Sequence, residues 1–180
     1  MENLMTADEV ASYLHLCKKT VYSLAKQGAI PSSKVGTNVR FSRPEIEKLF
    51  KTTVPNPKQF LVIDDSPSIN LIIKHVIASR GHFTLTAETG REGVELVKEC
   101  EFDKIFLDLR LPDIDGSETL RQIREINPKV PVIVITGYPD PAIMKDAIRY
   151  GIAGVLEKPF QPGRHRGSHR ELRARMPVGA

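Results

Sequence analysis

The sequence has few of the residues that mark several common protein classes. Its 180 residues include no tryptophan and only two cysteines, and aromatic residues make up 6%. With so few rings, a single-stranded nucleic-acid binder that stacks bases on aromatic side chains is not expected. No apolar run is long enough to span a bilayer, and residues 1–6 lack the basic and apolar regions of a secretory signal. We therefore expect a cytoplasmic protein without membrane contact.

The two cysteines, Cys17 and Cys100, fall in different predicted domains. In a protein expected in a reducing compartment, such a pair is more often reduced and packed than joined as a disulfide or shared by a metal. We therefore expect two reduced thiols.

Charge is distributed unevenly along the chain. The composition, with 41% hydrophobic and 27% charged residues, is that of an ordinary soluble globular protein, and the net charge is +4. Residues 1–58 carry nine basic and five acidic side chains, residues 59–163 carry twelve and sixteen, and residues 164–180 carry five and one. A basic N-terminal part favours contact with nucleic acid, and an acidic middle favours cations or phosphate-bearing partners.

Residues 1–51 are predicted to form a small domain with a hairpin between its helices. Thr6 and Glu9 match a capping box that starts the first helix. Residues 18–27 carry apolar side chains at helical spacing, and Gly28 follows as a helix-ending residue. A turn at residues 36–38 predicts a hairpin, and a last helix is expected after Ser42. Two short helices joined by a tight turn are typical of a helix-turn-helix.

This block resembles the excisionase/MerR-like winged helix-turn-helix family. The matching pieces are, in order, M-T-A-D-E-V-A-S-Y-L, K-T-V-Y-S-L, G-A-I-P, V-G-T-N-V-R-F and P-E-I-E-K-L. The resemblance implies binding to double-stranded DNA, with the second helix in the major groove and the hairpin, or wing, on the backbone. The residues implied near base edges are Lys18, Thr20, Tyr22 and Ser23. Those implied near phosphates are Lys19, Lys26, Lys34 and Arg40. The alternative is a small helical domain whose basic face binds protein.

Residues 59–160 are predicted to form an α/β domain, joined to the first by a linker at residues 52–58 that contains two prolines. Five short apolar runs alternate with stretches of helical periodicity. The runs are residues 59–63, 83–87, 105–108, 131–135 and 153–156. This alternation predicts right-handed βαβ crossovers and a parallel sheet covered on both faces.

Polar side chains follow four of these predicted strands. They are Asp64, Asp65, Asp108, Thr136 and Lys158. Because the carboxyl ends of parallel strands meet at one edge of a sheet, we expect these side chains to gather there. Carboxylates that hold a hard divalent cation can accept a phosphoryl group from an anionic donor, since the cation offsets the repulsion. Asp108, which ends a buried strand before a rigid loop, is the candidate acceptor.

The same residues resemble the receiver domain of two-component response regulators. The matching motifs are D-D, D-L-R-L-P-D-I-D-G, I-T-G and K-P-F, after the first, third, fourth and fifth strands. The resemblance implies a flavodoxin-like, doubly wound five-stranded sheet of order 2-1-3-4-5. It also implies that Mg²⁺ or Mn²⁺ is held by Asp64, Asp65, Asp108 and the backbone carbonyl of Arg110. Lys158 would then pair with the phosphoryl oxygens, Thr136 would donate a hydrogen bond to them, and Lys158–Pro159 is a candidate cis peptide.

The resemblance further implies a conformational switch, with Thr136, Tyr138 and Val155 as candidates. The family often has an aromatic residue three positions before the lysine, where this chain has Val155. Tyr138 would then take the role of that aromatic residue in the switch. Residues 161–180 are rich in arginine and contain glycine and proline, so we expect a largely disordered tail in place of a regular fifth helix.

Together these features predict a DNA-binding response regulator that could act as a homodimer. A histidine kinase or phosphotransfer protein would phosphorylate Asp108, and the protein would be a phosphoacceptor rather than a turnover enzyme. One alternative is an architectural or recombination accessory protein whose receiver only mediates protein contacts. Another is a phosphatase of the haloacid dehalogenase type.

Overall fold

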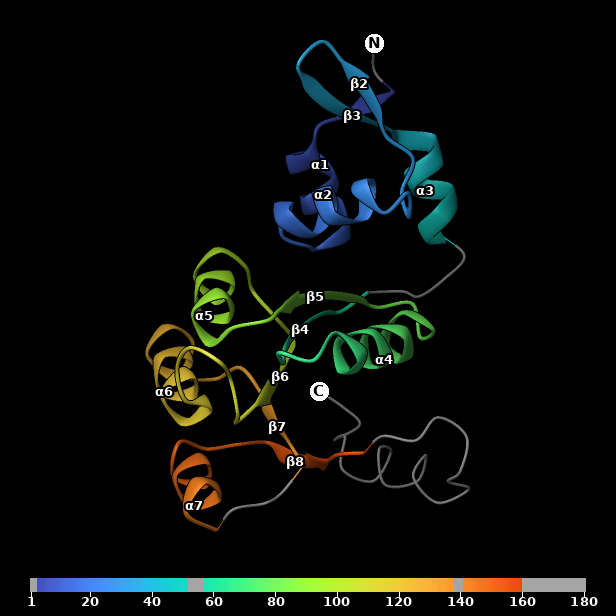
Figure 1. Cartoon of the computed structure of the whole chain (residues 1–180). Coiled ribbons are helices and arrows are strands. Elements are labelled where there is room, and N and C mark those ends of the chain that lie inside the picture. Colours follow the sequence, from blue (N-terminus) through green and yellow to red (C-terminus); the bar gives the residue numbers. More distant parts are fainter. Residues whose placement is uncertain (1–2, 52–56, 138–140, 160–180) are drawn as a thin grey trace.

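The computed structural model describes residues 3–51, 57–137 and 141–159, and Figure 1 shows how its elements are arranged. The N-terminal part consists of β1 (Leu4–Met5), α1 (Ala7–Leu14), α2 (Lys18–Lys26), β2 (Ser33–Val35), β3 (Asn38–Ser42) and α3 (Arg43–Lys51). The predicted helix-turn-helix, hairpin and last helix are therefore confirmed. The strand β1 was not predicted, because two residues are too few to show an alternating pattern.

Local sequence signals account for the ends of these elements. Thr6 and Glu9 form the predicted capping box: the Glu9 N–H donates to the Thr6 hydroxyl at 3.2 Å, and the Glu9 carboxylate accepts from the Thr6 N–H at 2.7 Å. Gly28 adopts a φ of +70° just after α2, a conformation that glycine allows without strain. The antiparallel strands β2 and β3 form the wing, and β1 pairs with the other edge of β3.

The second part contains a five-stranded parallel sheet. Its strands are β4 (Gln59–Ile63), β5 (Phe83–Ala87), β6 (Lys104–Asp108), β7 (Val132–Thr136) and β8 (Gly154–Glu157). Its helices are α4 (Pro67–Ala78), α5 (Gly90–Glu99), α6 (Gly116–Ile126) and α7 (Pro141–Arg149). The strand order is β5-β4-β6-β7-β8, which confirms the expected order 2-1-3-4-5.

Helices lie on both faces of the sheet (Figure 1), and its three central strands β4, β6 and β7 are mostly buried. On one face, α5 and α6 bury apolar side chains of the central strands, including Leu61, Ile105 and Leu107. On the other face, α4 packs Ile73 and Ile77 against the sheet. The carboxyl ends of the strands are left free to carry polar groups. Within the described residues, no helix is both long and apolar enough to cross a membrane.

The two parts contact each other at the beginning of α2, and also where Lys74 donates to Gln27 at 2.9 Å and where the Phe50 and Phe83 rings lie 5.7 Å apart. The side chain of Gln59, at the start of β4, is 2% exposed. Its carbonyl oxygen accepts from the Cys17 N–H at 3.1 Å and from the Thr20 hydroxyl at 2.7 Å, and its amide donates to the Glu101 carbonyl at 2.8 Å. Lys19 forms an ion pair with Glu99 at 3.0 Å across the same contact.

Cys17 and Cys100 are joined by a disulfide bond across this contact, with their Cα atoms 5.3 Å apart. The expectation of two reduced thiols is therefore wrong for this structure. The two cysteines are separated by 83 residues, and they meet because α2 docks onto the end of α5. Residue patterns within either part do not indicate that these two helices meet.

Candidate functional site

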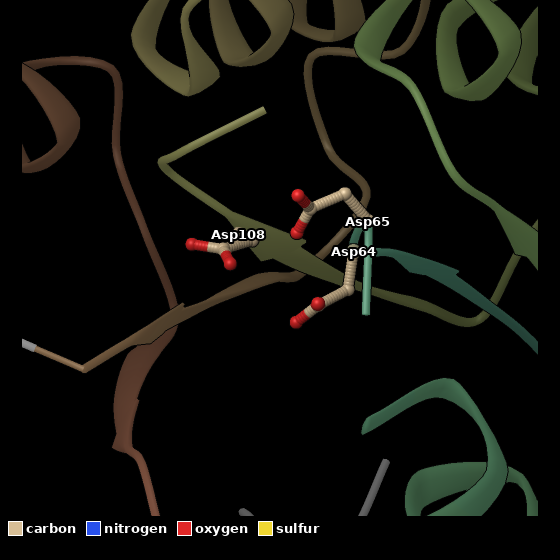
Figure 2. Close-up of side chains that lie close together, drawn as sticks. All are labelled: Asp64, Asp65 and Asp108. Atoms are coloured by element: carbon tan, nitrogen blue, oxygen red, sulfur yellow. The ribbon is translucent and has the colours of Figure 1, made fainter. Parts of the chain in front are cut away.

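Three carboxylates meet at the carboxyl edge of the sheet. Asp64 and Asp65 follow β4 directly, and Asp108 is the last residue of the neighbouring strand β6. One oxygen from each of the three lies within 4.8 Å of the others, and Figure 2 shows them at the ends of these two strands. Asp64 and Asp108 are buried, whereas Asp65 is exposed. The predicted gathering of these acids is confirmed.

Lys158 follows β8 and brings a positive charge to the same edge. Its ammonium nitrogen lies 2.6 Å from Asp108 Oδ2 and 2.7 Å from Asp64 Oδ2. Burial lowers the pKa of Lys158, but the hydrogen bonds and charges of Asp108 and Asp64 outweigh it and raise the pKa overall. Lys158 is therefore a fixed cation between two carboxylates. The Lys158–Pro159 peptide bond is cis, as expected.

The carboxylate of Asp64 is not fully compensated by its surroundings. Burial raises its pKa, the Asp108 charge acts in the same direction, and Lys158 and the Ser66 N–H only partly oppose them. Its Oδ2 is buried and lies 2.7 Å from the Lys158 ammonium, which it shares with Asp108. Three acids facing one lysine leave excess negative charge, and oxygen ligands suit Mg²⁺ or Mn²⁺. The residues present therefore fit a hard divalent cation.

Thr136 ends β7, next to the strand that carries Asp108, and its side chain is buried. The Lys158 N–H donates to the Thr136 backbone carbonyl at 2.8 Å, which links the ends of β7 and β8. Val155 lies on β8 opposite Val134 and is half-buried. Tyr138, the tail at residues 161–180 and most of the predicted linker lie outside the described residues. The switch roles of Thr136 and Val155 stay predictions.

The loop after Asp108 is fixed by its own backbone. The Arg110 N–H donates to Asp108 Oδ1 at 3.0 Å. A Cβ on Gly116 would come within 2.3 Å of the Leu109 Cα and 2.6 Å of the Asp108 carbonyl oxygen, so only glycine fits there. The loop thus holds the carboxylate of Asp108 in place. The role of the Arg110 carbonyl as a metal ligand stays a prediction.

Asp113 is a supporting residue that the sequence reasoning missed. Its carboxylate accepts from the N–H groups of Gly90 and Arg91 at 2.8 and 3.0 Å. Desolvation raises the pKa of Asp113, but these backbone hydrogen bonds lower it overall. The charge caps the beginning of α5, where the helix dipole favours an anion. The sequence feature that could have identified Asp113 is an acidic residue between Pro112 and Gly116, in the loop that follows the acceptor Asp108.

The residues predicted to contact DNA divide into two groups in the structure. One group lines a hollow between α2 and the wing with a volume of about 410 Å³, to which Lys18, Tyr22 and Arg40 contribute. Lys18 pairs there with Asp8 at 2.7 Å, and 44% of the Tyr22 surface is exposed. Lys26 and Lys34 are exposed, and the Ser23 hydroxyl accepts from Gln27 at 2.8 Å.

The other group faces the second part of the chain. Thr20 is 1% exposed and its hydroxyl donates to Gln59, so the expectation that it approaches base edges does not hold in this arrangement. Lys19 is half-exposed but paired with Glu99. The family resemblance had placed Thr20 on the DNA-contacting face of α2. The sequence did not show that this face packs against Gln59.

Comparisons with known proteins agree with this geometry. Residues 60–167 match the family model described as the response regulator receiver domain, and residues 4–53 match one described as a helix-turn-helix domain. The chain belongs to the response regulator receiver family, and its receiver domain is preceded by a helix-turn-helix domain. It is therefore a signalling protein of the DNA-binding response regulator class.

Individual relatives show how far this likeness extends. The chain is 32% identical to the chemotaxis protein CheY of Thermotoga maritima over 59% of its own length and 90% of CheY. It is 33% identical to the transcriptional regulatory protein ZraR of Escherichia coli over 56% of its length, but that match spans only 23% of ZraR. A response regulator from Burkholderia pseudomallei, solved with a phosphorylated aspartic acid, calcium ion and citrate, superposes with a TM-score of 0.54. Its identity is 25%, covering 67% of this chain and 76% of that one.

Proposed function

We propose that Asp108 accepts a phosphoryl group from a histidine kinase or phosphotransfer protein in the cytoplasm, and that the state of the receiver controls DNA binding by the N-terminal domain. The observation that supports this most directly is the cluster of Asp64, Asp65 and Asp108 beside the Lys158 ammonium. A phosphorylated aspartic acid in the similar Burkholderia protein is consistent with it.

In this proposal Asp65, Asp108 and the Arg110 carbonyl hold Mg²⁺ or Mn²⁺ directly, and Asp64 acts mainly through water. The bound cation would neutralise the charge that an incoming phosphoryl group brings. Asp108 Oδ1 is positioned by the Arg110 N–H, and Oδ2 contacts Lys158. Lys158 would exchange part of its contact with Asp108 for the phosphoryl oxygens. The Thr136 hydroxyl would donate to those oxygens and draw the end of β7 inward.

The DNA-binding surface, called the reader below, would consist of α2 and the wing. Lys18, Tyr22 and Arg40 border one polar hollow, which suits a DNA strand approaching between helix and hairpin. Lys26 and Lys34 add exposed positive charge on the same domain. Basic residues along a helix-turn-helix and its wing supply the salt-dependent contacts with phosphates.

Incubation with acetyl phosphate and Mg²⁺ tests the phosphoacceptor. Intact-protein mass spectrometry should show addition of one phosphoryl group to the wild type and none to Asp108→Asn. Sustained hydrolysis of a simple phosphate ester would instead assign a phosphatase. Absence of any mass change would leave the receiver as a protein-contact module.

Fluorescence anisotropy with a labelled random-sequence duplex tests the reader. Affinity should fall steeply as salt rises, and Arg40→Ala should reduce the slope of log affinity against log salt by about 1. Lys98→Ala is the charge-matched control, because Lys98 lies on α5 and pairs with Glu95. Equal slopes for the two variants would remove the wing from the DNA contact.

A further inference from the structure

The contact between the two domains contains a pair of cysteines at two helix ends. Cys17 is the residue before α2, and Cys100 is the residue after α5. Their Cα atoms are 5.3 Å apart, within the range that a disulfide can bridge without movement of the backbone. Both residues are therefore placed so that one docking arrangement allows the bond and separation of the domains prevents it.

The surroundings of the pair tie it to the same docking arrangement. Gln59 accepts from the Cys17 N–H and from the Thr20 hydroxyl, and that hydroxyl lies 3.3 Å from the Cys17 sulfur. Cys17 is half-buried, whereas Cys100 is only 6% exposed. A small oxidant would therefore reach Cys17 more readily. Cys17 also occupies a helix N-terminus, which favours a negatively charged sulfur, the nucleophilic form.

We propose that Cys17 and Cys100 form a reversible thiol–disulfide switch that locks the DNA-reading helix α2 onto the receiver. The oxidant would be a low-molecular-weight disulfide. The Cys17 thiolate attacks one sulfur of that disulfide and releases one small thiol. The Cys100 thiolate then attacks the Cys17 sulfur of the mixed disulfide and releases the second. The protein loses two electrons and two protons, the small disulfide is reduced to two thiols, and a small thiol in excess reverses both steps.

The lock would oppose DNA binding because the docked face of α2 carries Lys19 and Thr20, two residues for which the family resemblance implies DNA contacts. Thr20 is buried against Gln59, and Lys19 is held by Glu99. Exposed Glu99 and Glu101 on either side of Cys100 would also repel phosphates. In the reduced protein these noncovalent contacts can open when DNA competes for α2. In the oxidised protein the covalent bond keeps them closed, whatever the state of Asp108.

The test uses the full chain equilibrated with reduced or oxidised glutathione. Peptide mapping after alkylation should find the Cys17–Cys100 bond only in the oxidised sample. Hydrogen exchange should then be slower across residues 17–26. If oxidation leaves at most a tenth of the molecules able to open, the apparent Kd for the random-sequence duplex rises at least about tenfold. Cys17→Ser and Cys100→Ser should each bind DNA equally under both conditions, and either variant suffices if the other folds poorly.

The switch rests on the proposed DNA function, so the experiment must distinguish failure of the disulfide switch from failure of DNA binding by α2. Failure of glutathione disulfide to produce the bond in wild type overturns the switch and leaves DNA binding by α2 intact. Formation of the bond with slowed exchange in α2 but unchanged DNA affinity overturns the lock as a control of DNA binding and excludes the docked face of α2 from the DNA contact. A loss of affinity that persists in both serine variants also overturns the switch, because another oxidation site would then be responsible.

Discussion

Replacing Asp64 by asparagine should make the metal-free protein more stable. The Asp64 carboxyl is fully buried, and burial together with Asp108 raises its pKa above the ordinary value of 3.8. Between the ordinary and the raised value, the folded state binds more protons than the unfolded state. Stability therefore falls as pH rises through this window and stays reduced above it. Asparagine removes that charge, and its carbonyl oxygen can accept either from the Ser66 N–H, 2.9 Å away in wild type, or from the Lys158 ammonium.

The gain at pH 7.5 in EDTA should equal the free energy that the raised pKa represents, and each unit of pKa is worth about 1.4 kcal/mol. The gain should vanish below about pH 3.8, where Asp64 is protonated in both states. Added Mg²⁺ should favour the wild type: free cation at ten times its Kd stabilises the folded state by about 1.4 kcal/mol. The variant, with a weaker site, should gain less, so the difference should shrink or reverse.

Urea unfolding followed by circular dichroism measures these differences. Asp113→Asn is the control of opposite sign, because backbone hydrogen bonds lower the pKa of Asp113 and its ionised form stabilises the fold. That variant should be less stable at pH 7.5 and should converge with wild type in acid. If Asp64→Asn were no more stable than wild type in EDTA, the reasoning about uncompensated buried charge would be refuted.

Three other predictions can be tested with the same unfolding assay. Gly116→Ala should cost about 2 kcal/mol because its Cβ would meet backbone atoms of the acceptor loop, whereas Gly154→Ala, with open space around it, should be close to neutral. Thr6→Ala should cost about 1 kcal/mol through loss of the α1 cap, and Thr6→Ser should restore it. Lys158→Gln should lower stability in EDTA by at least about 1 kcal/mol and should respond more strongly to Mg²⁺, since two buried carboxylates lose their cation.

The elements that could be predicted from sequence are those whose signals are local. The apolar run at residues 59–63 and the acids after it predicted both β4 and the position of Asp64. The resemblance supplied the order of the strands, which then brought Asp108 and Lys158 together. Capping at Thr6 and the turn at Gly28 depend on neighbours a few residues away, and they were predicted for that reason.

The features that were missed depend on how the two domains dock. In the sequence, Gln59 is a single polar residue at the start of a predicted strand. The three hydrogen-bond partners of its side chain lie 39–42 residues away along the chain. Thr20 is buried and its hydroxyl donates to Gln59, a contact that the sequence of α2 alone does not indicate. The disulfide arises from the same docking. Sequence periodicity describes which face of an element is apolar, but it does not specify which polar face meets another domain.

Borohydride trapping tests the central claim most directly, because it identifies the carboxylate that carries the phosphoryl group. The protein is incubated with acetyl phosphate and Mg²⁺, reduced with sodium borohydride, digested and sequenced by mass spectrometry. An aspartyl phosphate is reduced to homoserine, and we expect that product at position 108 and at no other acid. Homoserine at position 64 or 65, or unmodified aspartate at all three positions, would contradict the account.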